Sequence, residues 1–157
     1  MPPSRKEPSE TDQKKTSIQS DLGFRNQVNK DILSRYFDGY VLRTSPFGDS
    51  ISSENLYKRA ERLAAAVNLV TAHISETEPL RAEARKESLT LLRYALRIYA
   101  ELRANGSEYV HDLQASVRTL ISYLRILGVT GRVSTQNMTI LVEALDELGN
   151  FPATVQK

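Results

Sequence analysis

Apolar residues recur at alternating steps of three and four through most of the chain from residue 53 to residue 150. This spacing places them on one face of a helix, so it predicts amphipathic helices rather than strands. Four such series predict helices over about 53–75, 79–104, 107–128 and 134–149. The expected core rows are Leu56, Ala60, Leu63, Val67, Val70 and Ile74; Ala84, Leu91, Leu92, Ala95, Leu96, Tyr99 and Leu102; Val110, Leu113, Val117, Leu120, Leu124 and Leu127; and Met138, Leu141, Leu145 and Leu148.

Residues that start or stop helices lie at the expected boundaries. Ser52 or Ser53 can cap the first helix, and Pro79 suits the first turn of the second. The expected helix ends are Asn105-Gly106, Gly128, and Gly149 with Pro152. The predicted linkers have about four, two and six residues, and such short linkers make consecutive helices antiparallel. We therefore expect an all-α, up-down-up-down four-helix bundle.

The chain divides into four regions by composition. Residues 1–17 have no apolar residue after Met1, which predicts a disordered arm. Residues 18–52 predict a short extra helix near 26–37, followed by a loop with turn-forming residues at 45–50. Residues 53–150 form the predicted bundle, and residues 151–157 form a tail.

Composition excludes several kinds of site. The 157 residues contain no cysteine, so thiolate metal sites, disulfides and cysteine nucleophiles are excluded. The net charge is only +2, so the chain as a whole is not strongly polycationic. No apolar run approaches the roughly 18–20 residues that span a bilayer, and the N-terminus has no apolar signal region. We therefore expect a cytoplasmic protein with no membrane contact.

The sequence contains no pattern typical of an enzyme. Motifs of nucleotide-binding loops, serine hydrolases and zinc proteases are absent. Glu108 and His111 have the spacing of di-metal bundle ligands, but such sites need two Glu-x-x-His pairs and two further glutamates. Both residues also point away from the predicted core. We expect neither a catalytic site nor a bound metal or cofactor.

Basic residues form rows on three of the predicted helices. On the second helix these rows are separated from Glu83, Glu87 and Glu101, and on the third they recur every seven residues. Either they pair with glutamates on solvated faces, or they contact the phosphates of a nucleic acid. The candidate nucleic-acid-binding residues are Lys58, Arg62, Lys86, Arg93, Arg97, His111, Arg118 and Arg125.

The first predicted helix has a second apolar stripe roughly opposite its core row. It consists of Ala65, Ala66, Leu69 and Ala72, and small residues there allow another helix to approach closely. Either the 18–37 segment covers this stripe, or it is an interface with another subunit or partner.

Segments in both halves of the predicted bundle resemble a family of small four-helix-bundle proteins. In the first half they are the 55–63 segment, NLYKRAERL, and the acidic, proline-containing link that follows its helix. In the second half they are the 120–128 segment, LISYLRILG, then Asn137, and the 145–149 segment, LDELG. The family comprises proteins encoded in ribosomal-RNA intervening sequences and the related accessory variability determinants of diversity-generating retroelements. The resemblance covers about residues 53–150. The chain departs from the family in the link, which lacks the usual aromatic-proline pair, and in its first 50 residues, which have no counterpart.

The resemblance implies a cytoplasmic, non-catalytic homo-oligomer with a basic surface. Accessory members of the family bind RNA or DNA and a reverse transcriptase, and Lys58, Arg118 and Arg125 match their basic positions. The leading hypothesis is therefore a nucleic-acid-binding accessory protein of a reverse transcriptase. The alternative is a protein-interaction adaptor that does not bind nucleic acid and uses the stripe of Ala65, Ala66, Leu69 and Ala72 together with residues 18–52.

Overall fold

Four helices lie between residues 51 and 155 of the protein, joined by short non-helical segments. The computed structural model describes residues 3–4 and 42–155. The helices are α2 (Ile51–Val70), α3 (Pro79–Ala104), α4 (Gly106–Val129) and α5 (Thr135–Val155), and the part of the chain described contains no strand. The chain divides into two units, residues 1–43 and 44–157, and all four helices belong to the second. Apart from residues 3–4, the arm predicted over 1–17 and the helix predicted near 26–37 lie outside the described residues.

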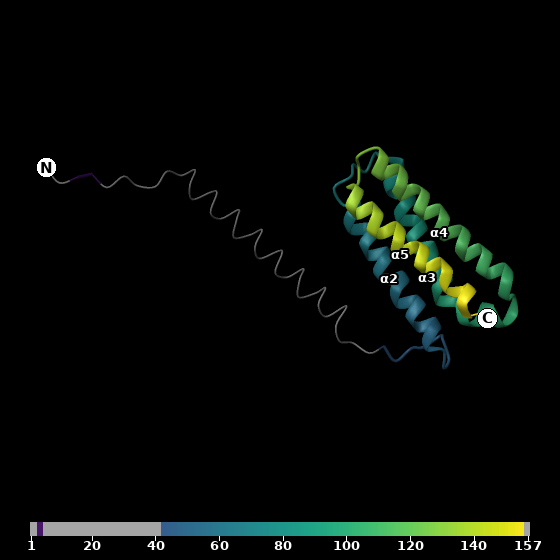
Figure 1. The fold of residues 1–157 in the computed structure, drawn as a ribbon. Helices are drawn as coiled ribbons and strands as arrows, with labels where there is room; N and C mark the ends of the chain where they lie inside the picture. Colours follow the sequence, from purple (N-terminus) through teal and green to yellow (C-terminus); the bar gives the residue numbers. More distant parts are fainter. Residues whose placement is uncertain (1–2, 5–41, 156–157) are drawn as a thin grey trace. The chain divides into compact units, whose positions relative to one another are not determined.

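The helices form the predicted up-down-up-down bundle (Figure 1). Each packs against the next in sequence, and α2 also packs against α5, so α3 and α5 lie diagonally opposite each other. Two contacts show that α2 and α5 are antiparallel: Arg59 pairs with Glu147, and His73 bonds to the carbonyl of Arg132. No helix among the described residues is both long and apolar enough to cross a membrane.

Leucine, isoleucine, valine and alanine fill the core between the four helices. The predicted row of the third helix is buried along its whole length, and Leu113, Leu120, Leu124 and Leu127 are fully enclosed. On α3 the prediction was partly wrong, because Ile98 is fully buried while Leu96 and Tyr99 are only half-buried.

The first helix ends earlier than the expected residue 75. After Val70 the chain makes turns through residues 71–74, and Ile74 still reaches the core. Arg85 donates to the Thr71 hydroxyl at 2.9 Å and to the Asn68 carbonyl at 3.2 Å, and Arg81 donates to the Thr71 carbonyl at 3.3 Å. Cations at the negative end of a helix satisfy its last carbonyls and stabilise that end.

Gly128 is the last residue but one of α4, within one residue of the predicted end, whereas Gly149, which was expected to stop the last helix, lies inside α5. α4 continues through Gly128 to Val129, and α5 continues through Gly149 and Pro152 to Val155, into the predicted tail. A Cβ at position 128 would lie 2.9 Å from Met138 Cγ, and one at position 149 would lie 3.2 Å from Val117 Cγ1. These glycines therefore allow α4 and α5 to approach each other closely.

The true ends of the helices use other residues. Gly131 takes the left-handed conformation (φ 73°) after α4, and the Leu127 carbonyl accepts from the N–H groups of Arg132 and Val133. Gly106 begins α4 and has no positive φ. At the start of α2, the side chain of Ser50 accepts from the Ser53 N–H, so Ser50 is the cap rather than Ser52 or Ser53.

The turn predicted before the first helix is present at residues 46–49 and packs onto the bundle. Phe47 is buried and its ring stacks on Tyr57 with centroids 5.4 Å apart. Gly48 has φ 55°, and a Cβ there would lie 2.7 Å from the Tyr99 hydroxyl. Only glycine fits both the backbone conformation and this close contact.

Candidate nucleic-acid interface

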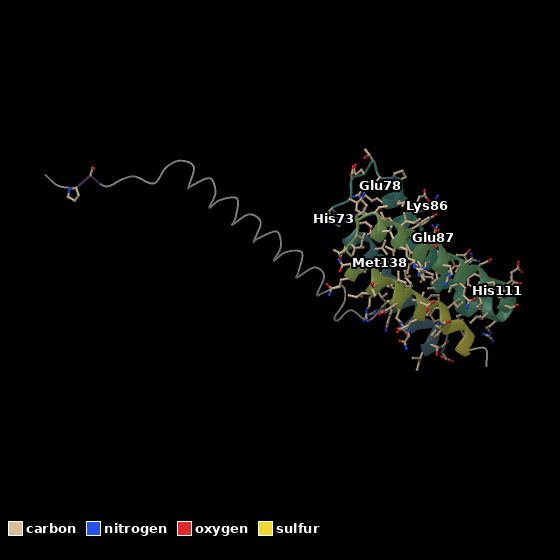
Figure 2. The ribbon with its side chains drawn as sticks, turned by 45° about the horizontal axis from the view of Figure 1, so that its top comes forward. His73, Glu78, Lys86, Glu87, His111 and Met138 are labelled. Atoms are coloured by element: carbon tan, nitrogen blue, oxygen red, sulfur yellow. The ribbon has the colours of Figure 1, made fainter. Side chains whose placement is uncertain are left out.

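Charge is distributed unequally between the two diagonally opposed helices. α3 carries six basic and three acidic residues, whereas α5 carries three acidic residues and no Lys, Arg or His. Arg81 and Arg85 of α3 turn toward the end of α2. Lys86, Arg93 and Arg97 are exposed on α3, so the predicted basic row of this helix does lie on its surface (Figure 2 labels Lys86).

Most of the predicted binding residues have no carboxylate partner among the described residues. The structure gives no ion pair within 4.0 Å for Arg62, Lys86, Arg93, Arg118 or Arg125 in residues 42–155. Two predicted residues are paired one helical turn away: Lys58 with Glu54 at 3.4 Å, and Arg97 with Glu101 at 2.6 Å. Ion pairing within the bundle therefore leaves most of these cations available.

The basic row of α4 faces a different groove from that of α3. Gln114 lies between His111 and Arg118 on this face, and its side chain donates to the Gly149 carbonyl of α5 at 3.0 Å. His111, Arg118 and Arg125 are exposed along this α5 side of α4. On the other side of α4, Ser116 donates to Glu87 of α3 at 2.6 Å. The two rows therefore do not form one continuous basic surface.

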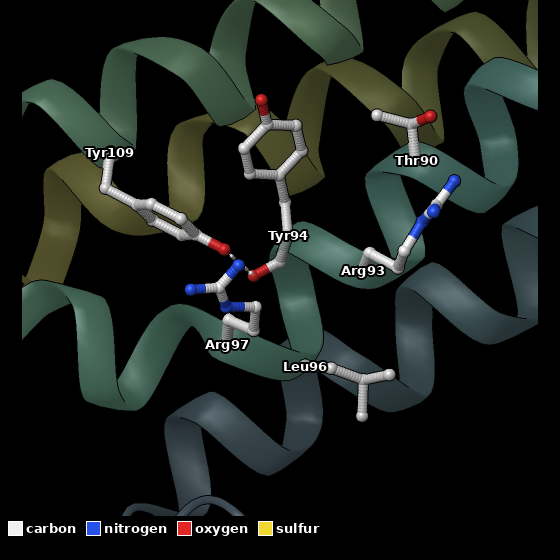
Figure 3. Close-up of a pocket in the computed structure, with 6 residues that line it drawn as sticks. All are labelled: Thr90, Arg93, Tyr94, Leu96, Arg97 and Tyr109. Carbon is white, nitrogen blue, oxygen red and sulfur yellow. Dashed lines mark hydrogen bonds between the residues drawn. The ribbon is translucent and has the colours of Figure 1, made fainter.

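A recess of about 390 Å³ lies beside the basic row of α3. Its lining residues are Thr90, Arg93, Tyr94, Leu96 and Arg97 of α3 and Tyr109 of α4 (Figure 3). The two tyrosine rings meet edge to face, with centroids 5.3 Å apart, and the Tyr109 hydroxyl donates to the Tyr94 carbonyl at 2.9 Å. This hydrogen bond fixes the position of the Tyr109 ring relative to α3.

Burial makes the Tyr109 hydroxyl harder to ionise than that of an exposed tyrosine. Burial raises the pKa of Tyr109 to about 12; Arg97 opposes this increase, and Glu101, Tyr94 and Asp112 add to it. Tyr109 therefore keeps its donor proton to a higher pH than an exposed tyrosine does. Tyr94 and Tyr109 were not among the residues predicted from the sequence, and they lie beside Arg93 and Arg97 only because α3 and α4 pack together.

The second apolar stripe of α2 is shorter than predicted. Ala65 and Ala66 are half-buried, and Leu69 is 66 % exposed. Ala72 is exposed but lies in the turn after Val70, so it is not on the helix. The remaining stripe is Ala65, Ala66 and Leu69.

The described residues contain no group of three or more His, Asp or Glu that could hold a metal ion. Glu108 and His111 are both exposed (Figure 2 labels His111 at the opposite end of the bundle from His73).

The fold and the candidate surface can be compared with known proteins. No protein-family model, curated protein or solved structure gives a significant match to the chain. The resemblance to intervening-sequence and accessory proteins therefore stays a prediction.

Proposed function

We propose that this chain is a non-enzymatic binding protein that contacts the phosphates of RNA or DNA through the exposed arginines of α3 and α4. The observation that supports this most strongly is that Arg93, Arg118 and Arg125 are exposed and have no carboxylate within ion-pair distance in residues 42–155. An arginine that is not paired within the protein can neutralise a phosphate and release its counterion without first breaking an ion pair.

Salt-dependent binding tests this proposal. The full chain should bind a single-stranded oligonucleotide with an affinity that falls steeply as salt rises. Replacing Arg118 and Arg125 with glutamine should weaken binding and reduce the slope of log affinity against log salt concentration by about 1.4. Each lost phosphate contact reduces the magnitude of this slope by about 0.7 for a single strand. Fluorescence anisotropy across a salt series measures both quantities.

A matched control removes the same charge elsewhere. Arg59 and Arg132 already pair with Glu147 and Glu78, each at 3.1 Å, so replacing both with glutamine lowers the net charge by the same amount. This control should change the salt slope much less than the Arg118 and Arg125 variant does. Equal effects of the two double variants would refute specific contact by the α4 row.

We also propose a reverse transcriptase of a diversity-generating retroelement as the protein partner, in line with the sequence resemblance. A reverse transcriptase gene with a template repeat beside the gene for this chain would support this partner. Co-purification of the two proteins, retained after nuclease treatment, would test it directly.

A second candidate function is a protein-interaction adaptor, and two exposed apolar residues favour it, Leu69 on α2 and Ile140 on α5. Leu69 and Ile140 are 66 % and 57 % exposed, so they offer an apolar surface to a second copy of the chain. Sedimentation should then show an oligomer that persists at high salt and dissociates in Leu69→Glu; a monomeric wild type would contradict it.

A further inference from the structure

The recess between α3 and α4 combines aromatic, apolar and cationic groups in one place. We propose that it binds one unstacked base of a single-stranded nucleic acid, with Arg93 and Arg97 holding the adjacent phosphates. This inference rests on the proposed function and deepens it, because it assigns the kind of nucleic acid and the part of it that enters the protein.

The size and walls of the recess fit a base. Its volume of about 390 Å³ lies within the range of roughly 300–1,000 Å³ that is typical of small-molecule sites. Tyr94, Tyr109 and Leu96 supply ring and aliphatic surface, and Thr90 supplies a hydroxyl (Figure 3). Aromatic side chains stack on any base, so such a site accepts single strands without a strong sequence preference.

The two arginines give the recess its preference for an anion. Arg93 has no carboxylate partner among residues 42–155, so its guanidinium is available to a phosphate. Arg97 uses Nη2 to reach Glu101, but its side chain is 70 % exposed and keeps further N–H donors. A guanidinium can also stack on a base, so these residues can contact either part of a nucleotide.

The geometry favours a single strand over a duplex. Bases in a duplex are paired and stacked, and removing one from the stack has a free-energy cost that an unpaired strand largely avoids. An acidic peptide could match the charge of Arg93 and Arg97, but aspartate and glutamate side chains have no flat ring to lie against Tyr94 and Tyr109.

A pair of oligomers separates base contacts from phosphate contacts. One is a thymidine ten-mer, and the other is an abasic ten-mer with the same number of phosphates. The full chain should bind the thymidine ten-mer about tenfold more tightly, since stacking contributes roughly 1–3 kcal/mol per base. A glutamate ten-mer serves as the acidic peptide and should bind more weakly than the thymidine ten-mer.

A filling substitution tests whether the base advantage comes from the recess. Thr90→Leu enlarges a lining residue without changing charge, and leucine is the better helix former. Thr139→Leu on α5 is the matched control, because both threonine hydroxyls donate to the carbonyl four residues earlier. Thr90→Leu should bring thymidine binding down to the abasic level, and Thr139→Leu should leave it unchanged. Circular dichroism confirms that each variant is folded.

Crosslinking gives an independent readout. A 5-iodouracil ten-mer irradiated in complex with the chain should label Tyr94 or Tyr109, located by mass spectrometry, and Thr90→Leu should abolish the label. Labelling at other tyrosines alone would overturn the inference.

Failure of this inference differs from failure of the proposed function. If neither ten-mer binds, the proposed function is wrong and the inference falls with it. If both bind equally, or if Thr90→Leu keeps the base advantage, phosphate binding stands and the base site is refuted. If the glutamate ten-mer binds as tightly as the thymidine ten-mer, the recess is a site for an acidic protein segment and the inference is also refuted.

Discussion

The close approach of α4 and α5 predicts that one methyl group added at Gly128 destabilises the bundle. Alanine in a helix is favoured over glycine by about 1 kcal/mol. The new Cβ, however, would lie 2.9 Å from Met138 Cγ and 3.2 Å from Met138 Cε, so the methionine must move. Overpacking of this kind costs about 1–3 kcal/mol, which leaves a net loss of about 1 kcal/mol in the free energy of unfolding.

Gly106→Ala is the matched comparison. Gly106 begins α4 without a positive φ, and a Cβ added there would have no atom within 4 Å. This substitution should stabilise the protein by about 0.5 kcal/mol, mainly because it restricts the unfolded chain. Urea denaturation followed by circular dichroism measures both variants, and unchanged m-values would show that the midpoints report stability.

A double variant identifies the contact responsible. In Gly128→Ala combined with Met138→Ala, Cγ and Cε are absent and only the Cβ of residue 138, at 3.3 Å, remains close, so alanine at 128 should be much less destabilising. The expected coupling between the two sites is about 1–2 kcal/mol. If Gly128→Ala stabilises the protein as Gly106→Ala does, the inferred role of Gly128 in helix contact is refuted.

Three further predictions concern side chains outside the basic rows. Arg85→Met removes the hydrogen bonds to Thr71 and Asn68 and should destabilise the bundle by about 1–2 kcal/mol in urea denaturation, whereas Arg103→Met should have little effect. The pKa of Tyr109 is about 12 in the folded state and near its ordinary value of 10.0 in the unfolded chain. Its contribution to stability is therefore complete below pH 10 and is lost as the pH rises to about 12. The urea midpoint should therefore fall over this pH range, less so in Tyr109→Phe. Ser116→Ala removes the donor to Glu87 and should lower the free energy of unfolding by about 1 kcal/mol.

The helical rows could be predicted from the sequence because burial follows the helical period directly. The α4 row from Val110 to Leu127 is buried as expected, and α3 has the predicted bounds. The omission of Ile98 was not a limit of periodicity, because Ile98 lies seven residues after Leu91 and three after Ala95, on the same buried row of α3.

Gly149 gave the clearest error in the predicted boundaries, because α5 continues past it to Val155. Gly128 and Gly149 have no Cβ, and the same property suits a helix end and a close helix contact. Which role applies depends on what lies opposite, and Met138 and Val117 are distant in sequence from these glycines. The end of α2 was missed for a similar reason, because Arg85, from the next helix, supplies its cap.

The candidate site could be predicted only in part. Periodicity placed Arg93, Arg118 and Arg125 on exposed faces, and the structure agrees. It did not reveal that the two rows border different grooves, which the contact between Gln114 and Gly149 establishes. Nor did it reveal the recess, because Tyr109 reaches Tyr94 only when α4 folds back against α3.

The unequal charge of α3 and α5 has a kinetic consequence. Because the basic helix and the acidic helix lie on diagonally opposite sides, the bundle has an electric dipole perpendicular to its long axis. In the field of a polyanion this dipole produces a torque that turns α3 toward the polyanion before contact, so a larger fraction of diffusional encounters is productive. Substitution of an α3 cation outside the recess, such as Lys86→Gln, should therefore change the association rate at low ionic strength more than the dissociation rate.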